Sequence, residues 1–279
     1  MNLPPLLMLC IAMLAFAANS LLCRLALGVW AMDPVSFTSL RIVSGALLLA
    51  VLHIARGGVR HWRFEPLSAL ALYAYAILFS LAYVSLPAGT GALLLFSAVQ
   101  LTMLSVAIAR GERPSALAWT GFGAAVLGVV VLLKPGLAMP APAAAAMMLG
   151  AGVAWGVYTL RGARGHDPVA ATTWNFVAAA PLAVIVSLSG LSTVSLNAPG
   201  IVAALASGMG ASALGYVVWY RVLPRLTGTL AATAQLSVPL LAAVGGALLL
   251  HEPLGLRLAI SSVLILGGIA LVVRARQRR

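Results

Sequence analysis

Charged residues are scarce in this sequence, and their scarcity excludes a soluble protein. They make up 8% of the 279 residues, whereas a soluble domain carries about 25%. Hydrophobic residues make up 62%, and the mean hydropathy is +1.07. The surface of such a chain has to be covered mainly by membrane lipid. We therefore interpret it as an all-α polytopic membrane protein.

Acidic residues, lysine and cysteine are rarer still. The chain has five acidic residues, two cysteines and a single lysine. Cys10 and Cys23 on one helix would lie about 20 Å apart, too far for a disulfide, and no zinc or redox spacing occurs. The basic residues are spread between apolar runs instead of forming one patch, which argues against a nucleic-acid partner. We expect no metal and no cofactor.

Long apolar runs dominate what is present. A membrane-spanning helix needs about 20 mostly apolar residues, and the breaks between runs fall at Pro, Gly and charged residues. The loops are too short for a soluble domain. The sequence predicts ten transmembrane helices, over residues 3–23, 34–55, 66–85, 88–109, 115–133, 143–161, 169–190, 199–220, 228–250 and 256–274.

The basic residues predict the topology. With the N-terminus in the cytoplasm, thirteen of the seventeen lie in inner loops or the C-terminal tail. The outer loops hold three, Arg24, Lys134 and Arg257, and Arg41 alone lies within a span. Cytoplasmic loops carry the excess of Lys and Arg. We therefore expect a multi-pass protein of the bacterial inner (plasma) membrane with both termini cytoplasmic.

The two halves of the chain repeat each other. Asp-Pro-Val begins at positions 33 and 167, and Tyr-x-x-Leu-Pro begins at positions 83 and 220. Five helices per half place the second copy upside down in the membrane, an arrangement common in secondary transporters. We predict two inverted five-helix repeats, residues 1–137 and 138–279, with a substrate site between them near the midplane.

Two short motifs precede the last helix of each predicted half. Gly-Glu-Arg-Pro occupies positions 111–114, and His-Glu-Pro occupies positions 251–253. With the ten-helix duplicated pattern, they make the whole chain resemble the EamA-type members of the drug/metabolite transporter (DMT) superfamily. Within it, the chain is similar to amino-acid exporters of the YddG kind. The resemblance implies export of amino acids or similar metabolites.

Ionised groups inside the predicted spans are almost absent. All five acids lie at helix ends, so the buried carboxylate of many proton-driven transporters is missing. This favours uniport or exchange. Arg41 has forked donors suited to a substrate carboxylate. The alternatives are that it bonds helix-end carbonyls or Asp33, or that it extends outward to the membrane surface.

Aromatic and amide side chains within the spans are the other candidates for substrate binding. Lipid does not satisfy their polar atoms, so each needs a partner or a cavity. For the tyrosines and tryptophan the alternative is an interfacial belt, and for the amides it is a bond between helices. With Arg41, the candidates for a central aromatic and polar cavity are Asn19, Tyr83, Gln100, Trp155, Tyr158, Asn175, Tyr216, Tyr220 and Gln235.

These patterns predict a secondary transporter that exports a small-molecule substrate by alternating access. A membrane enzyme is disfavoured because the sequence has no catalytic motif, and a channel because it has no filter repeat. A lipid or lipid-linked sugar flippase and a multidrug exporter remain alternatives. Both a monomer and a homodimer remain open. Paired glycines, including Gly121 and Gly268, predict close helix packing in helices 5 and 10.

Overall fold

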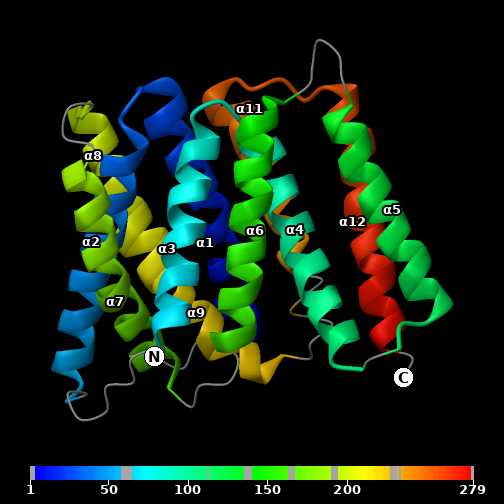
Figure 1. Cartoon of the computed structure of the whole chain (residues 1–279), viewed down its shortest axis with the longest axis horizontal. Coiled ribbons are helices and arrows are strands. Elements are labelled where there is room, and N and C mark those ends of the chain that lie inside the picture. The colour runs from blue at the N-terminus through cyan, green and yellow to red at the C-terminus, as the bar shows by residue number, and fades with distance from the viewer. Residues whose placement is uncertain are drawn as a thin grey trace.

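The computed structural model describes residues 4–57, 65–111, 113–134, 140–162, 167–189, 194–226, 231 and 234–277. In these ranges the chain is helical, with no strand. Figure 1 shows the helices side by side in one bundle, with both ends of the chain on the same side. An all-α polytopic membrane fold, as predicted, is confirmed.

The first half contains five long helices. The first of them continues for five residues as a π-helix, η1. Their bounds are α1 Pro5–Arg24, η1 Leu25–Val29, α2 Pro34–Ala55, α3 Pro66–Tyr83, α4 Ala88–Ala109 and α5 Ala116–Leu133.

The second half contains two long helices, then a segmented one, and then two more. In the segmented helix, α-helical turns flank a nine-residue π-helix, η3, and a short 3-10 turn, η4, ends it. The bounds are α6 Pro142–Gly162, α7 Pro168–Ser189, α8 Ala198–Leu205, η3 Ala206–Leu214, α9 Gly215–Val222, η4 Leu223–Arg225, α11 Ser237–Leu250 and α12 Leu256–Gln277.

Proline and a capping side chain begin several of these helices. The carboxylate of Asp33 accepts the backbone N–H of Ser36 at 2.7 Å, and Pro34 occupies the first helical position. Asp167 accepts the N–H of Val169 at 2.9 Å in the same way at the start of α7. Proline lacks the donor that would be left unpaired there, and the carboxylate satisfies the next ones. The Asp-Pro-Val motifs therefore mark helix starts.

Nine helices in the described ranges are long and apolar enough to cross a membrane. The first and eighth run further than predicted, as Pro5–Val29 and Ala198–Arg225. Arg24 therefore lies inside a helix and not in a loop. Only Ser237–Leu250 of the expected span 228–250 is a described continuous helix. The expected helix start at 228–229 and the Glu112 of the first motif lie outside the described residues.

Helices at equivalent positions of the two predicted repeats pack against each other: α2 with α7, α4 with α11, and α5 with α12. Helix α6 packs on α3 and α4, while α1 packs on η3, α9 and α11. A two-fold axis in the membrane plane would give this pattern. The contacts agree with an inverted repeat, which itself stays a prediction.

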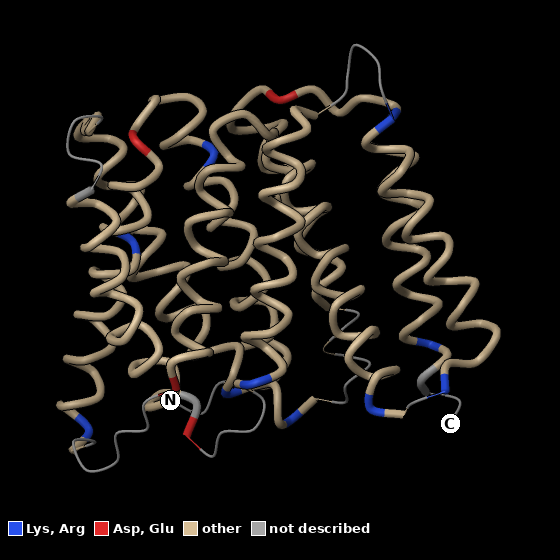
Figure 2. Tube along the Cα trace, viewed as in Figure 1, with Lys and Arg blue, Asp and Glu red and all other residues tan. Residues whose placement is uncertain are grey.

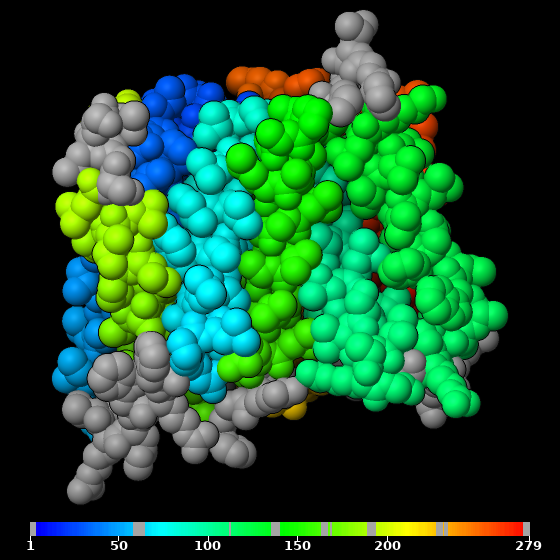
Figure 3. Space-filling model, viewed as in Figure 1, coloured from blue at the N-terminus to red at the C-terminus, as the bar shows by residue number. Residues whose placement is uncertain are grey.

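The α5–α12 pair stands at one edge of the bundle, beside α4 (Figure 1), and α5 covers that edge of the face drawn in Figure 3. Its close approach depends on glycine. A Cβ added to Gly121 would come within 2.5 Å of the carbonyl oxygen of Gly268, and one added to Gly128 within 2.7 Å of Ile265. Gly123 and Gly267, in contrast, face open space. The pair is therefore held by backbone-to-backbone packing along one glycine-lined seam.

Charged residues gather at the two ends of the bundle, with one exception (Figure 2). Most of the Lys and Arg positions drawn lie at the end that holds the termini. Arg41 lies within the bundle, about 10 Å along the span Pro34–Ala55 from its start.

Candidate functional site

Arg41 is buried at the centre of the bundle, with 1% of its surface exposed. Its Nε donates to Ser212 Oγ at 2.9 Å, and its Nη2 donates to Tyr75 Oη and Tyr216 Oη, both at 3.2 Å. The guanidinium carbon lies 5.2 Å from the ring centre of Tyr75 and 5.3 Å from that of Phe79. The alternatives of a bond to Asp33 or to helix-end carbonyls, or of an outward extension, are therefore wrong.

A chain of hydrogen bonds extends from Arg41 to α1. Asn19 Nδ2 donates to Tyr75 Oη at 3.2 Å, and Ser207 Oγ donates to Asn19 Oδ1 at 2.6 Å. Ser207 and Ser212 both lie in the π-helix η3. Such wide turns are frequent at functional sites. The network joins α1, α2 and α3 of the first half to η3 and α9 of the second.

A small cavity adjoins this network. Its lining comes from α1, α3 and α4 of the first half and from α6 and α9 of the second. The empty space, about 270 Å³ when the crevices between atoms are included, leaves room for roughly one water molecule. The lining residues are Phe16, Asn19, Ser20, Tyr75, Phe79, Leu95, Phe96, Trp155 and Tyr216.

Trp155 lies at the centre of the aromatic cluster. Its ring centre is 4.9 Å from that of Tyr75, 4.8 Å from that of Tyr216 and 6.0 Å from that of Phe16. The tilted and edge-on arrangements are those that aromatic pairs favour. The cluster presents apolar ring faces and a few hydroxyl and amide groups, the kinds of groups that commonly line small-molecule sites.

Three predicted site residues line the cavity: Asn19, Trp155 and Tyr216. Arg41 lies directly behind the wall, in contact with Tyr75, Phe79 and Tyr216. The structure therefore brings these four together.

Tyr158 and Asn175 form a second layer beside Trp155. The Tyr158 ring centre is 5.4 Å from that of Trp155, and Asn175 Nδ2 donates to Tyr158 Oη at 3.4 Å. Tyr220 follows, with its ring centre 6.2 Å from that of Tyr158. None of these three lines the cavity.

Tyr83, Gln100 and Gln235 also lie away from the cavity lining. Tyr83 is fully buried near the end of the bundle opposite the termini, where its Oη donates to the Ala88 carbonyl at 3.2 Å. Gln235 is buried, and Gln100 is half-buried. The interfacial-belt interpretation is wrong for Tyr83 and for Tyr220, because neither side chain reaches the surface.

Sequence reasoning missed six lining residues: Phe16, Ser20, Tyr75, Phe79, Leu95 and Phe96. For two of these residues the sequence contains a feature that could have identified them as site candidates. Tyr75 carries a hydroxyl within a span, the criterion that selected the other tyrosines. Phe79 precedes Tyr216 by the same 137 residues that separate Tyr83 from Tyr220.

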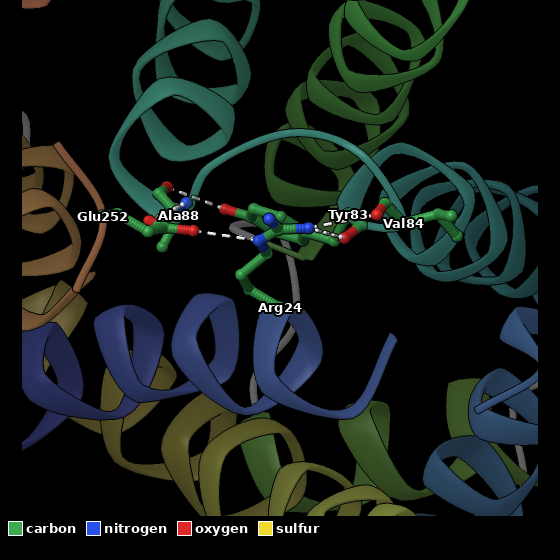
Figure 4. Close-up of polar contacts among 5 residues, drawn as sticks. All are labelled: Arg24, Tyr83, Val84, Ala88 and Glu252. Atoms are coloured by element: carbon green, nitrogen blue, oxygen red, sulfur yellow. Dashed lines mark hydrogen bonds and ion pairs between the residues drawn. The ribbon is translucent and has the colours of Figure 1, made fainter. Parts of the chain in front are cut away.

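A second cluster closes the end of the bundle opposite the termini (Figure 4). Arg24 Nε is 2.9 Å from Glu252 Oε1, and Arg24 Nη1 donates to the carbonyls of Tyr83 and Val84 at 3.3 and 3.0 Å. Glu252 Oε2 accepts the N–H of Ala88, the first residue of α4, at 2.7 Å. The carboxylate satisfies the start of α4 and the guanidinium satisfies the end of α3, where helix ends leave unpaired groups.

A weaker pair lies at the end that holds the termini. Arg161 Nη2 is 3.3 Å from Glu65 Oε2, and Arg161 Nε donates to Ser68 Oγ at 2.9 Å. This joins α6 to the start of α3. Both side chains are partly exposed, 33% and 48%, and ion pairs in water contribute little. No group of three or more potential metal ligands occurs in the part of the chain that the structure describes.

The long apolar helices are those of a polytopic α-helical membrane protein, and comparison with known proteins gives its class, that of membrane transporters. Residues 142–274 match the model of the EamA-like transporter family. The threonine/homoserine exporter RhtA of Salmonella typhimurium (strain LT2) is 30% identical over 78% of this chain and 74% of its own length. The chain belongs to the EamA-like family, within the drug/metabolite transporter superfamily. The resemblance to EamA-type members of that superfamily, seen in the sequence, is confirmed.

Further comparisons extend over nearly the whole chain. An uncharacterised protein of Pseudomonas aeruginosa is 51% identical over 98% of this chain and 96% of its own length. A solved crystal structure superimposes with a TM-score of 0.70, covering 99% of this chain and 98% of the other, at 23% identity. That likeness shows the fold alone.

Proposed function

We propose that this protein exports amino acids by alternating access through the central cavity. The observation that carries the proposal is that both halves of the chain line one small aromatic and polar cavity. Contacts formed by both halves would change if the halves rocked against each other. RhtA, which matches over most of this chain, has threonine and homoserine export in its name. Of the ten predicted residues, Asn19, Arg41, Trp155 and Tyr216 would lie closest to the substrate, and the other six would support the site from outside the cavity lining.

The proposal also covers the orientation of the chain in the membrane and the way in which transport is driven. Residues 1–137 and 138–279 would be the inverted repeats, in the bacterial inner membrane with both termini cytoplasmic, as a monomer or a homodimer. The excess of basic residues at the end that holds the termini supports this orientation. The four described acids are helix caps or loop residues at the ends of helices. We therefore favour uniport or exchange over proton coupling through a buried carboxylate.

The test is uptake of radiolabelled amino acids into liposomes that contain the purified protein and no ion gradient. We expect saturable uptake of threonine or homoserine that does not change when a pH gradient is imposed and is lost in Trp155→Ala. Absence of uptake for every amino acid, with the protein folded, would overturn the proposal. The lipid-flippase and multidrug interpretations would then be tested next.

A further inference from the structure

The guanidinium of Arg41 has donors left over. Arginine carries five N–H groups, of which the Nε and Nη2 groups bond to Ser212, Tyr75 and Tyr216. Nη1 is buried and has no hydrogen-bond partner among the described residues. Two donors of a charged group are thus unsatisfied in the membrane interior, where this is costly. Such a group is a candidate for a ligand contact.

Arg41 also has no carboxylate beside it. The two ion pairs of the described ranges, Arg24–Glu252 and Arg161–Glu65, lie at opposite ends of the bundle. Asp33 is eight residues from Arg41, about 12 Å along α2, and its carboxylate caps that helix. Hydroxyl dipoles and two ring faces surround the guanidinium, so its charge is solvated and not neutralised.

The location of Arg41 connects this charge to the cavity. Three of the nine lining residues, Tyr75, Phe79 and Tyr216, contact the guanidinium through a hydroxyl or a ring face. Only these three side chains separate a molecule between the rings from the buried guanidinium of Arg41. Small rotations of Tyr75 or Tyr216 would expose it.

We propose that Arg41 anchors the carboxylate of the substrate through Nη1, so that the transporter selects molecules with a carboxylate and rejects organic cations. The inference rests on the central cavity of the proposed function and names the substrate group that the site recognises. An incoming carboxylate would supply both the missing counter-charge and the missing acceptors. The ring faces of Trp155 and Phe16 would cover the rest of the substrate, and a substrate ammonium would meet those faces and the Asn19 oxygen.

The first experiment leaves the protein unaltered and changes the ligand. The thermal stability of the purified transporter is measured with L-threonine, with L-threonine amide, which keeps the ammonium and loses the carboxylate, and with propionate, which keeps only a carboxylate. A ligand that binds the folded state raises the melting temperature, and the stabilisation grows with the logarithm of the ligand concentration divided by Kd. A hydrogen bond to a charged group corresponds to roughly ten- to a hundredfold in affinity. We expect threonine to bind more tightly than its amide by about that factor.

The second experiment compares variants. Arg41→Lys keeps the charge and loses the fork, so it is expected to retain a reduced preference for threonine over the amide. Arg41→Gln is expected to bind the two equally. Arg257→Gln is the matched control, because Arg257 is a basic residue that donates a hydrogen bond to the Lys134 carbonyl at the surface. If Arg41→Gln does not fold, the ligand comparison on the unaltered protein still decides.

The outcomes separate this inference from the proposed function. Equal binding of threonine and its amide, with threonine uptake intact, overturns the carboxylate anchor and leaves amino-acid export standing. Protection by propionate that is lost in Arg41→Gln, with no amino acid transported, supports the anchor and overturns amino-acid export. If no carboxylate stabilises the unaltered protein, Arg41 only joins helices and the inference is wrong.

Discussion

Arg24 and Glu252 are 228 residues apart in the sequence, and their charged groups meet at 2.9 Å at the end of the bundle opposite the termini. The pair joins α1 to the loop between α11 and α12. It also satisfies backbone groups at the end of α3 and the start of α4. The two side chains are largely buried, 19% and 11% exposed, so water screens this pair less than an exposed one.

Removing the charge of Glu252 should loosen this end of the bundle. In Glu252→Gln the ion pair is lost while the side chain keeps an oxygen for the Ala88 N–H. The conformation open at this end should therefore become more populated. The measurement is labelling of Ser20→Cys, at the cavity, by a membrane-impermeant maleimide added from that side, with Cys10 and Cys23 replaced by alanine. We expect labelling to be faster by about three- to tenfold, from a loss on the order of 1 kcal/mol.

Arg257→Gln is the control for this labelling, since Arg257 is a basic residue of the same end with an exposed bond to the Lys134 carbonyl. It should label at the unaltered rate. Equal labelling of Glu252→Gln and Arg257→Gln would show that the Arg24–Glu252 pair does not hold the cavity closed.

The hydroxyl of Tyr75 should be needed for stability. It accepts hydrogen bonds from Arg41 Nη2 and Asn19 Nδ2, both buried. Tyr75→Phe removes the oxygen to which Arg41 Nη2 and Asn19 Nδ2 both donate. The free energy of unfolding should therefore fall by about 1–3 kcal/mol. The measurement is unfolding in mixed micelles with increasing denaturant. Tyr73→Phe on the same helix is the control, because the Tyr73 hydroxyl makes no hydrogen bond with the residues that the structure describes and the loss should be small. Equal losses in both variants would contradict the prediction.

The starts of α2 and α7 followed from the sequence because their causes are local. Proline and aspartate act within one turn of a helix start, so Asp33 and Asp167 marked α2 and α7 correctly. The burial of Arg41 could be anticipated in the same way, because an ionised residue in a span rarely faces lipid.

The faces of the helices could not be predicted. In a membrane the residues facing lipid and those facing the core are both apolar, so the periodicity that orients a soluble helix is weak. Phe16 and Phe79 line the cavity, yet nothing in their own segments distinguishes them from Phe122, which contacts Trp119 on the outer α5. Arg24 was assigned to a loop because the continuation of α1 as η1 leaves no clear mark in the sequence.

Helix α5 should tolerate an added side chain at a glycine that faces away from α12 and not at a glycine in the seam between the two helices. A Cβ at Gly121 would approach backbone atoms of Gly268 and Val272, which do not move easily, whereas one at Gly123 meets nothing within 4 Å. Gly121→Ala should therefore destabilise the protein by about 1–3 kcal/mol, and Gly123→Ala should be neutral or slightly stabilising. Melting temperatures of the two purified variants test this directly. A larger loss in Gly123→Ala would mean that the seam is wrongly placed.

Trp155 should matter for substrate affinity more than for assembly. Its ring lies within 6.0 Å, centre to centre, of Phe16, Tyr75 and Tyr216, so the cluster loses its central surface in Trp155→Ala. Trp155→Phe keeps an aromatic face and should raise the KM for threonine uptake about three- to tenfold, since an aromatic pair contributes roughly 0.5–1.5 kcal/mol beyond its buried area. Trp119→Ala, at a residue 51% exposed on α5, should leave KM unchanged. An equal rise in KM in both tryptophan variants would argue that the effect comes from reduced fold stability and not from a lost substrate contact, because only Trp155 of the two lines the cavity.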